Sequence, residues 1–325
     1  MNNGSAKRPC RWHGMLCWET ELMKRDLLSL SDLGPGGVER IIADAELFAK
    51  SRGRLDHPRP LWGKSVALMF DKPSTRTRVS LEVAVSELGG HPLVITAQGS
   101  QLGRGEPIED TARVMSRYVH AIAYRTFGTD RITALAKYAS VPVLNALTDD
   151  AHPLQLLADL FTVKQVRGKL TGLKYAWIGD GNNMARSWIE SAKLCGLELW
   201  LACPEGFDPP EREIAAANAV GAKVVLVRDP MEAASAANVI STDVWTSMGQ
   251  EEEVARRKKA FEGFCISRKM MAKAASDAIV MHCLPAHRGE EIEAEVLESA
   301  QSVVWMEAEA RLHTAKAALN WAVAW

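Results

Sequence analysis

From residue 64 onward, short apolar runs rich in β-branched residues alternate regularly with helical patterns. Continuous apolar strands separated by amphipathic helices are typical of a parallel sheet that helices cover on both faces. The runs that we expect to form strands occupy residues 65–70, 92–97, 121–127, 141–147, 174–180, 197–204, 222–229, 238–245, 278–285 and 302–306. The chain is therefore predicted to have an α/β fold.

One long helical pattern, over residues 152–168, separates two similar series of strands. Because 325 residues exceed the usual size of a single domain, two domains are expected. The economical prediction is two doubly wound parallel-sheet domains that are joined by this helix. A last helix is predicted over about residues 308–324, directly after the run SVVWM.

The charge is balanced, with 39 basic and 40 acidic residues, so no global basic field indicates a nucleic-acid partner. No apolar run approaches the roughly 20 residues that span a bilayer, so no membrane partner is expected. Six cysteines without a CxxC pair favour reduced thiols and a cytoplasmic location. The alternative is the mitochondrial matrix, if the acid-free N-terminal stretch with Lys7, Arg8 and Arg11 is a transit peptide.

The stretch DKPSTRTR follows the first apolar run and opens a helical pattern. It places hydroxyl and guanidinium groups in five consecutive positions, Ser74, Thr75, Arg76, Thr77 and Arg78. Ser74 is a good N-cap candidate, and the first N–H groups of a helix point outward without partners. We interpret the stretch as a cradle for phosphate or carboxylate. The alternative is an ordinary capped helix with solvated arginines; a GxxxxGK[ST] loop is absent.

Further polar groups follow other strands of the first half. Arg125 ends the third run, and His152 and Gln155 stand three residues apart at a helix start, hence on one face. In open parallel sheets, ligands bind at the carboxyl ends of strands, so these residues are expected near the anion cradle. The alternative for His152 is a helix cap or a surface residue.

In the second half, GDGNN follows a strand and precedes a helix. A dinucleotide fingerprint is weak here because Met184 occupies the third glycine position and no acid closes the next strand. Asn182 and Asn183 therefore suggest hydrogen bonds to a small molecule. Asp243, within or just after a strand, would suit a cationic amine, the alternative being a buried loop acid.

The segment HCLPAHRG places Cys283 at a strand end. A zinc site from His282, Cys283 and His287 is not expected, because adjacent strand residues point to opposite faces. A second cluster of cysteines and histidines that could complete four ligands is also missing from the sequence.

Five segments, STRTR, YRTF, HPLQ, DVWTSMGQE and HCLPA, resemble in order and spacing those of the ornithine carbamoyltransferases, in the aspartate/ornithine carbamoyltransferase superfamily. The resemblance covers residues 24–325. It implies a tail (1–23), a carbamoyl phosphate-binding domain (24–155), an ornithine-binding domain (156–305) and a C-terminal helix (306–325) that packs back on the first domain. It also implies a homotrimer with shared active sites, and neither metal nor organic cofactor.

The resemblance also implies roles for individual residues. Carbamoyl phosphate would be bound by Ser74, Thr75, Arg76, Thr77, Gln101 (from a neighbouring subunit), Arg125, His152, Gln155, Cys283, Leu284 and Arg311. Ornithine would be held by Asn183, Asp243, Ser247 and Met248. The catalytic residues would be Arg76, Arg125, His152, Asp243 and Cys283, with direct attack by the ornithine amine and no covalent thiocarbamate. The products would be citrulline and phosphate, in arginine metabolism; both synthesis and breakdown of arginine fit.

Three positions depart from the family pattern: Leu81 replaces a frequent aromatic residue, Leu154 a frequent cysteine, and Ala310 the usual asparagine before Arg311. Among rival functions, an aspartate carbamoyltransferase would carry a lysine in the loop that here holds Gln101 and Arg104. Putrescine or N-acylated ornithine as substrate is disfavoured by the SMG segment. A nicotinamide dehydrogenase and a non-catalytic phosphate-binding module remain the alternatives from other classes.

Overall fold

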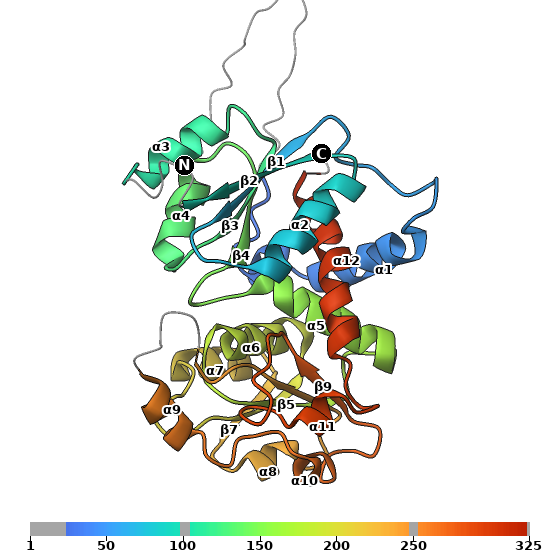
Figure 1. Ribbon diagram of the computed structural model, residues 1–325, viewed down its shortest axis with the longest axis vertical. Helices are drawn as coiled ribbons and strands as arrows, with labels where there is room; N and C mark the ends of the chain where they lie inside the picture. Colours follow the sequence, from blue (N-terminus) through green and yellow to red (C-terminus); the bar gives the residue numbers. More distant parts are fainter. Residues whose placement is uncertain (1–23, 98–104, 247–252, 324–325) are drawn as a thin grey trace, which may run out of the picture.

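The computed structural model describes residues 24–97, 105–246 and 253–323, which form two lobes stacked along the long axis (Figure 1). The first lobe contains a four-stranded parallel sheet of order β2-β1-β3-β4, and the second a five-stranded parallel sheet of order β7-β6-β5-β8-β9. The two non-sequential strand orders confirm the predicted pair of doubly wound α/β units.

The first sheet consists of β1 (Ser65–Phe70), β2 (His91–Thr96), β3 (Ala121–Arg125) and β4 (Val143–Leu147). Its crossover helices are α2 (Thr75–Glu87), α3 (Ile108–Met115) and α4 (Thr129–Tyr138). The two central strands are almost entirely buried because helices cover both faces, which explains their continuous apolar sequence. Helix α2 ends just before Gly89, whose φ of 83° fits the left-handed stop expected of glycine.

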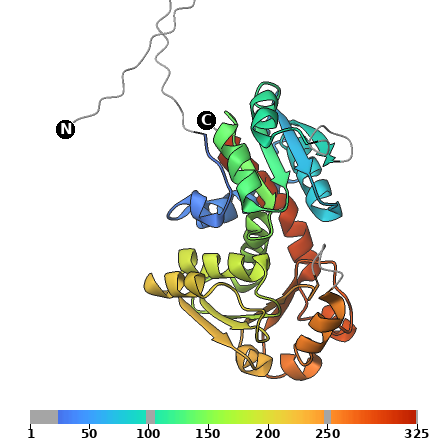
Figure 2. The same cartoon turned by 90° about the vertical axis from the view of Figure 1, so that its left-hand side faces the viewer.

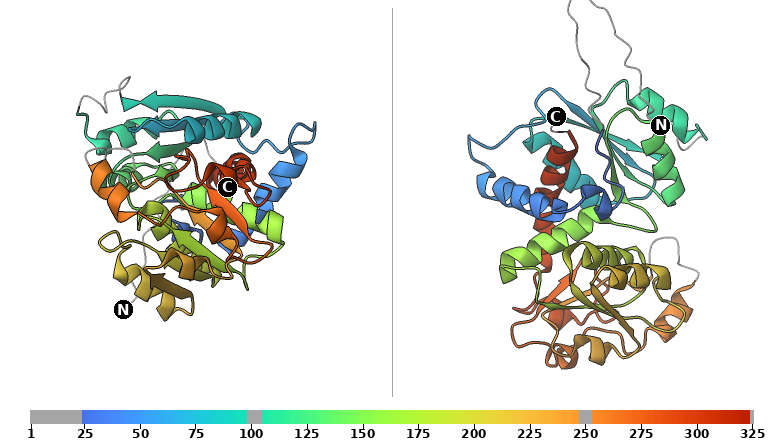
Figure 3. Two further views of the ribbon diagram at one scale, coloured as in Figure 1. Left: turned by 60° about the horizontal axis from the view of Figure 1, so that its bottom comes forward. Right: turned by 180° about the vertical axis from the view of Figure 1, so that it is seen from behind.

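The second sheet consists of β5 (Lys174–Ile178), β6 (Glu198–Ala202), β7 (Lys223–Val227), β8 (Val239–Thr242) and β9 (Ile279–His282). The helices around it are α6 (Asn183–Cys195), α7 (Glu211–Ala219), α8 (Pro230–Ala234), α9 (Val254–Ala260), α10 (Arg268–Met271) and α11 (Ala294–Leu297). Figure 3 shows this sheet enclosed by its helices from two further directions.

Two long helices join the lobes. Helix α5 (Pro153–Arg167) lies between them and is buried from Pro153 to Val163. Helix α12 (Val304–Val323) begins beside the second sheet and packs in the first lobe against α1 (Gly37–Ser51), α2 and α5 (Figure 2). This confirms the expected return of the last helix to the first lobe. Within the part of the chain that the structure describes, no helix could cross a membrane.

The sequence prediction is wrong at residues 302–306. Only Ser302 forms an isolated bridge, to Val280 beside β9, and helix α12 already begins at Val304. A short apolar run fits both a buried strand and the buried start of a helix, and here the helix forms. Helix α1 and the short 3₁₀ helix η1 (Leu30–Leu33) precede the alternating region and were not predicted. The domain boundaries at 155/156 and 305/306 stay predictions.

Because α12 packs in the core of the first lobe, we predict that Leu319→Ala lowers the free energy of unfolding by about 2–5 kcal/mol through lost burial and a residual cavity. Leu319 is fully buried, whereas Met306 on the same helix is 44% exposed. Thermal and denaturant unfolding would measure the difference, with Met306→Ala as the matched control. Equal losses in the two variants would contradict this packing.

Candidate active site

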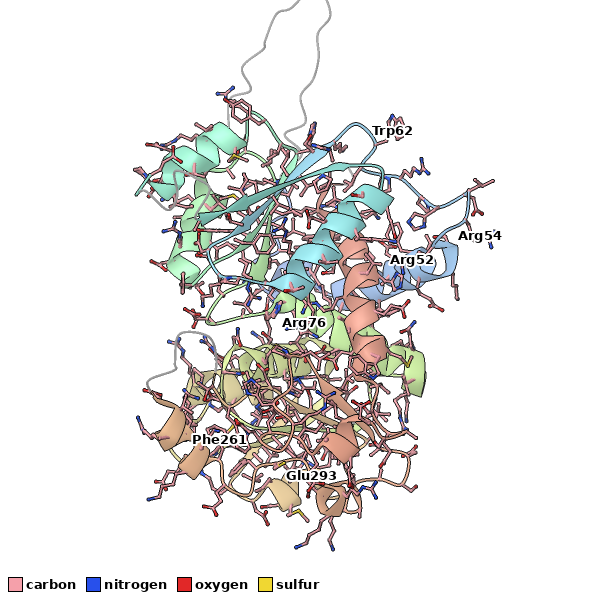
Figure 4. The ribbon with its side chains drawn as sticks, viewed as in Figure 1. Arg52, Arg54, Trp62, Arg76, Phe261 and Glu293 are labelled. Carbon is pink, nitrogen blue, oxygen red and sulfur yellow. The ribbon has the colours of Figure 1, made fainter. Side chains whose placement is uncertain are left out.

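The carboxyl ends of β1, β3 and β4 point toward the second lobe, and the candidate site lies there. Arg76 stands at the lower end of α2, where the first lobe faces the second (Figure 4). The sequence places polar side chains directly after these strands, and the parallel pairing of β1, β3 and β4 brings the segments together. The sheet topology thus brings the STRTR and YRTF segments to one edge.

The helix start after β1 is held by a buried network. Asp71 accepts hydrogen bonds from the hydroxyls of Tyr124 (2.5 Å) and Thr126 (2.7 Å), and its N–H donates to the carbonyl of Arg125 (2.9 Å). Asp71 thereby fixes the end of β1 to the end of β3. Sequence reasoning missed this residue, although an acid directly after a buried strand was an available signal.

Ser74 occupies the N-cap position of α2 as predicted, with an extended backbone. Its side chain makes no capping hydrogen bond to the described residues, so the hydroxyl and the first helical N–H groups are available to an anion. Thr77 is buried one turn later, and its hydroxyl accepts a hydrogen bond from Nη2 of Arg311 (2.6 Å).

Three guanidinium groups gather in this region. Burial is the main cause that lowers the pKa of Arg125, to about 10, and the charges of Arg311 and Arg76 add to it. Burial likewise lowers the pKa of Arg311. Nε of Arg125 is buried and finds no hydrogen-bond partner among the described residues. Crowded, partly desolvated cations of this kind are stabilised by an anionic ligand.

His152 and Gln155 both face this cluster, as their spacing predicted. His152 is the N-cap residue of α5, and its backbone N–H donates to the Ser187 hydroxyl (2.9 Å). Burial, together with Arg311 and Arg125, lowers the pKa of His152 well below its usual value, so its imidazole is neutral near pH 7. Gln155 accepts a hydrogen bond from Nη1 of Arg311 through its amide oxygen (2.7 Å).

Asp243 and Cys283 form the wall of the second lobe. Asp243 directly follows β8, and Cys283 directly follows β9. The thiol donates to Oδ1 of Asp243 (3.1 Å), which also accepts the N–H of Val244 (2.8 Å). Burial, and then the charge of Asp243, raises the pKa of Cys283 well above its usual value. The thiol is therefore a protonated hydrogen-bond donor near pH 7.

The two asparagines of GDGNN have different roles. Asn182 caps α6 by accepting the N–H groups of Met184 and Ala185, and its amide donates to Oδ2 of Asp243 (3.3 Å). Its contacts are therefore within the protein, in contrast to the small-molecule role expected from the sequence. Asn183 reaches across to the first lobe, where its amide donates to the carbonyl of Thr148 (2.8 Å).

After β9 the chain turns sharply at Leu284, whose φ is 57°. Its N–H donates to Nδ1 of His282 (2.9 Å), and Nε2 of the same ring contacts the buried Glu291 (2.9 Å). The expectation that the side chains of His282 and Cys283 point to opposite faces is wrong. Their potential ligand atoms and that of Asp243 lie within 4.8 Å of one another. Both ring nitrogens are already hydrogen-bonded, so His282 has no lone pair free for a metal.

Arg311 lies in the site even though Ala310 departs from the family pattern. Ala310 is buried in the hydrophobic core, and the preceding contacts to Thr77 and Gln155 fix the guanidinium without an asparagine beside it. Leu81 is likewise buried in the core, as a packing substitution would be. Three expected site residues, Gln101, Ser247 and Met248, lie outside the described residues.

Comparison with known proteins agrees with this arrangement. Residues 25–165 match the carbamoyl-P binding domain of aspartate/ornithine carbamoyltransferases, and residues 171–322 match their Asp/Orn binding domain. The ornithine carbamoyltransferase of Acidothermus cellulolyticus is 55% identical over 303 residues, covering 92% of this chain and 96% of that protein. That of Geobacter metallireducens is 50% identical over 298 residues, covering 91% and 98%.

Solved structures give the same result. The ornithine carbamoyltransferase of Pyrococcus furiosus superposes with a TM-score of 0.88 at 45% identity, covering 93% of this chain and 98% of that one. The Thermus thermophilus enzyme gives 0.84 at 41% identity, covering 92% and 99%. The chain therefore belongs to the aspartate/ornithine carbamoyltransferase family and is a carbamoyl-group transferase. Within that family it stands with the ornithine carbamoyltransferases, whose name all four of these relatives carry.

Because burial and then the charge of Asp243 raise the pKa of the Cys283 thiol, we predict slow alkylation of Cys283 by iodoacetamide at neutral pH. Alkylation should be faster in Asp243→Asn, where the charge is removed. Peptide mass spectrometry would follow each cysteine separately. Cys265 is the internal control, since burial is the main cause that raises its pKa to about 11 and Asp243 does not contribute. Unchanged labelling of Cys283 in the variant would contradict the assigned interaction.

Proposed function

We propose that this chain transfers the carbamoyl group of carbamoyl phosphate to the side-chain amine of L-ornithine, giving L-citrulline and phosphate. The observation that carries the proposal is that two chemically different groups of side chains, one from each lobe, line the candidate site. Three arginines and a helix N-terminus lie at the carboxyl edge of the first sheet, and the Asp243–Cys283 pair lies at that of the second. One wall suits a phosphate dianion and the other a cationic amine.

On the first wall, the leaving phosphate gains charge as its bond to the carbamoyl carbon breaks. Arg76 and the first N–H groups of α2 lie where they can neutralise that charge. The carbamoyl oxygen becomes negative in a tetrahedral intermediate, and Arg125, Thr77 and His152 supply donors to it. Because the imidazole of His152 is neutral, it can donate one N–H without adding a further positive charge.

On the second wall, the ornithine amine must lose a proton, from a reference pKa of about 10.4, before it can attack. The Asp243 carboxylate, held by Asn182 and Val244, can orient the amine and receive the proton. Cys283 stays protonated, so the thiol acts as a hydrogen-bond donor and no thiocarbamate is required. The amine nitrogen bonds to the carbamoyl carbon to form the tetrahedral intermediate. The intermediate collapses as the carbon–oxygen bond to phosphate breaks, and the second proton of the attacking nitrogen passes to the leaving phosphate.

Further parts of the proposal rest on the family resemblance. We infer a homotrimer in which Gln101 of a neighbouring subunit completes the site, and binding of ornithine by Asn183, Ser247 and Met248. A cytoplasmic location and a role in arginine biosynthesis complete the proposal. No metal or organic cofactor is part of the proposed mechanism.

The direct test is citrulline formation from carbamoyl phosphate and L-ornithine, with aspartate and putrescine offered as competing amines. We expect citrulline as the main product, because relatives at 50–55% identity are ornithine carbamoyltransferases. Product analysis by mass spectrometry separates the three outcomes. A folded sample that forms carbamoyl-aspartate or carbamoyl-putrescine in place of citrulline would refute the assigned substrate.

We further predict that Arg76→Ala lowers turnover by at least about hundredfold, because it removes charge from the leaving phosphate. The matched control is Arg78→Ala, two residues along the same helix, where the side chain is exposed and pairs with Glu82 (3.2 Å). Steady-state kinetics would compare the variants, and circular dichroism would confirm that both are folded. Similar activity in the two variants would exclude the role given to Arg76.

A further inference from the structure

Behind Gln155 and Arg311 lie two buried carboxyl groups, Asp159 on α5 and Glu307 on α12, each 1% exposed. The amide nitrogen of Gln155 donates to both, to Oδ1 of Asp159 (2.8 Å) and to Oε1 of Glu307 (3.1 Å). The other oxygen of Glu307 accepts the N–H of His282 at the end of β9 (2.9 Å). The carboxyl groups thus connect both lobes through α5, α12 and β9.

The hydrogen bonds around the two carboxyl groups favour a proton between them. Oδ2 of Asp159 is buried, and no donor among the described residues reaches it. Two ionised carboxylates that accept from a single amide nitrogen would repel each other in a poorly hydrated interior. A single proton removes the repulsion and supplies the missing donor, as in other buried carboxyl pairs.

The surrounding charges favour one net negative charge. Arg311, on α12, is the adjacent cation, and Asp243 beyond β8 is the other acid that faces the pair. Cys283 after β9 is a neutral thiol, and the charge of Arg76 on α2 lowers the pKa of Arg311 after burial, the main cause. His152 on α5 is neutral. Burial and the nearness of each acid to the other raise the pKa of both Asp159 and Glu307.

We propose that Asp159 and Glu307 share one proton and act as a positioning pair that orients Gln155 and Arg311 toward the bound phosphate group. Gln155 is the link, because its nitrogen is held by the pair and its oxygen therefore turns to Arg311. This proposal rests on the proposed function, since the phosphate is taken to belong to carbamoyl phosphate. Neither carboxyl group touches substrate.

Loss of the shared proton at alkaline pH leaves two negative charges behind one arginine. The second charge cancels the field of Arg311 and repels the ligand, so affinity for a phosphate dianion decreases. If phosphate binding shifts the pKa of the carboxyl pair by one unit, the affinity for phosphate differs tenfold between the protonated and the deprotonated pair. We therefore expect the affinity of the wild-type protein for inorganic phosphate to fall by about tenfold as the pH is raised from neutral to alkaline values.

Two amide variants remove the shared proton and keep most of the hydrogen bonds. Asp159→Asn keeps an oxygen for Gln155 and offers an N–H to Glu307. Glu307→Gln keeps an oxygen for His282 and offers an N–H to Asp159, but it gives up the bond that the second Glu307 oxygen accepts from Gln155. Each variant retains a single carboxyl group, so a second negative charge cannot develop there at alkaline pH. Titration calorimetry would measure the affinity of each variant for inorganic phosphate. The change of this affinity with pH should be at least about fivefold smaller than in the wild type.

Asp180→Asn is the matched control, because Asp180 is a buried acid of the second lobe that pairs with Arg257 (2.5 Å) and, among the described residues, shares no hydrogen-bond donor atom with a second carboxyl group. It should keep the pH dependence of the wild type. The same pH dependence in the wild type and both amide variants would overturn the proposal, as would a flattened profile in Asp180→Asn. Infrared spectroscopy of the wild type adds a measurement that needs no variant. A protonated-carboxyl band should be present at neutral pH and lost at alkaline pH, and its absence at neutral pH would also overturn the proposal.

Phosphate binding also separates this proposal from the proposed function. If the wild type forms no citrulline but the amide variants lose the pH dependence, the positioning pair stands and the assigned reaction fails. If citrulline forms and the variants behave like the wild type, the reaction stands and the pair fails.

Discussion

The candidate site depends on the guanidinium group of Arg311, which joins three helices from distant parts of the chain. From α12 it donates one hydrogen bond to Thr77 on α2 and another to Gln155 on α5. Both bonds are buried, where a hydrogen bond from a charged group contributes more than at the surface and its loss costs more. The anion cradle, the helix between the lobes and the last helix are therefore held in one relative geometry by one side chain.

The buried arginines that form the site also repel each other when no ligand is bound. Arg125 and Arg311 are desolvated and repel each other, and Nε of Arg125 is left without a described partner. Such repulsion is tolerated because the rest of the fold, including the Asp71 network, determines the position of the strand ends. The negative charge of a bound anion offsets the repulsion between these arginines. Because the repulsion is already present in the folded protein, its removal favours tight binding of phosphate.

Sequence patterns could predict the fold class, the strand series and the gathering of Arg76, Arg125 and His152, because the carboxyl ends of parallel strands share one edge. They could not predict Asp71, Asp159 or Glu307, whose roles arise from tertiary partners far away in the chain. The position of Asp159 within the apolar helix α5 was a signal in the sequence. Its partner Glu307 could not be predicted, because no sequence pattern relates the two residues. The run SVVWM failed because its apolar pattern fits strand and helix equally.

The separation of Thr77 from Arg311, 234 residues along the chain, has a consequence for synthesis. Chains are made from the N-terminus, and an early lobe can fold before the rest exists. A nascent chain therefore carries the STRTR segment long before it carries the arginine that completes it. Until α12 is made and inserted beside α2 and α5, the first lobe lacks both a core helix and part of its anion site. An incomplete chain on the ribosome should therefore compete poorly for the cell's supply of the phosphorylated substrate.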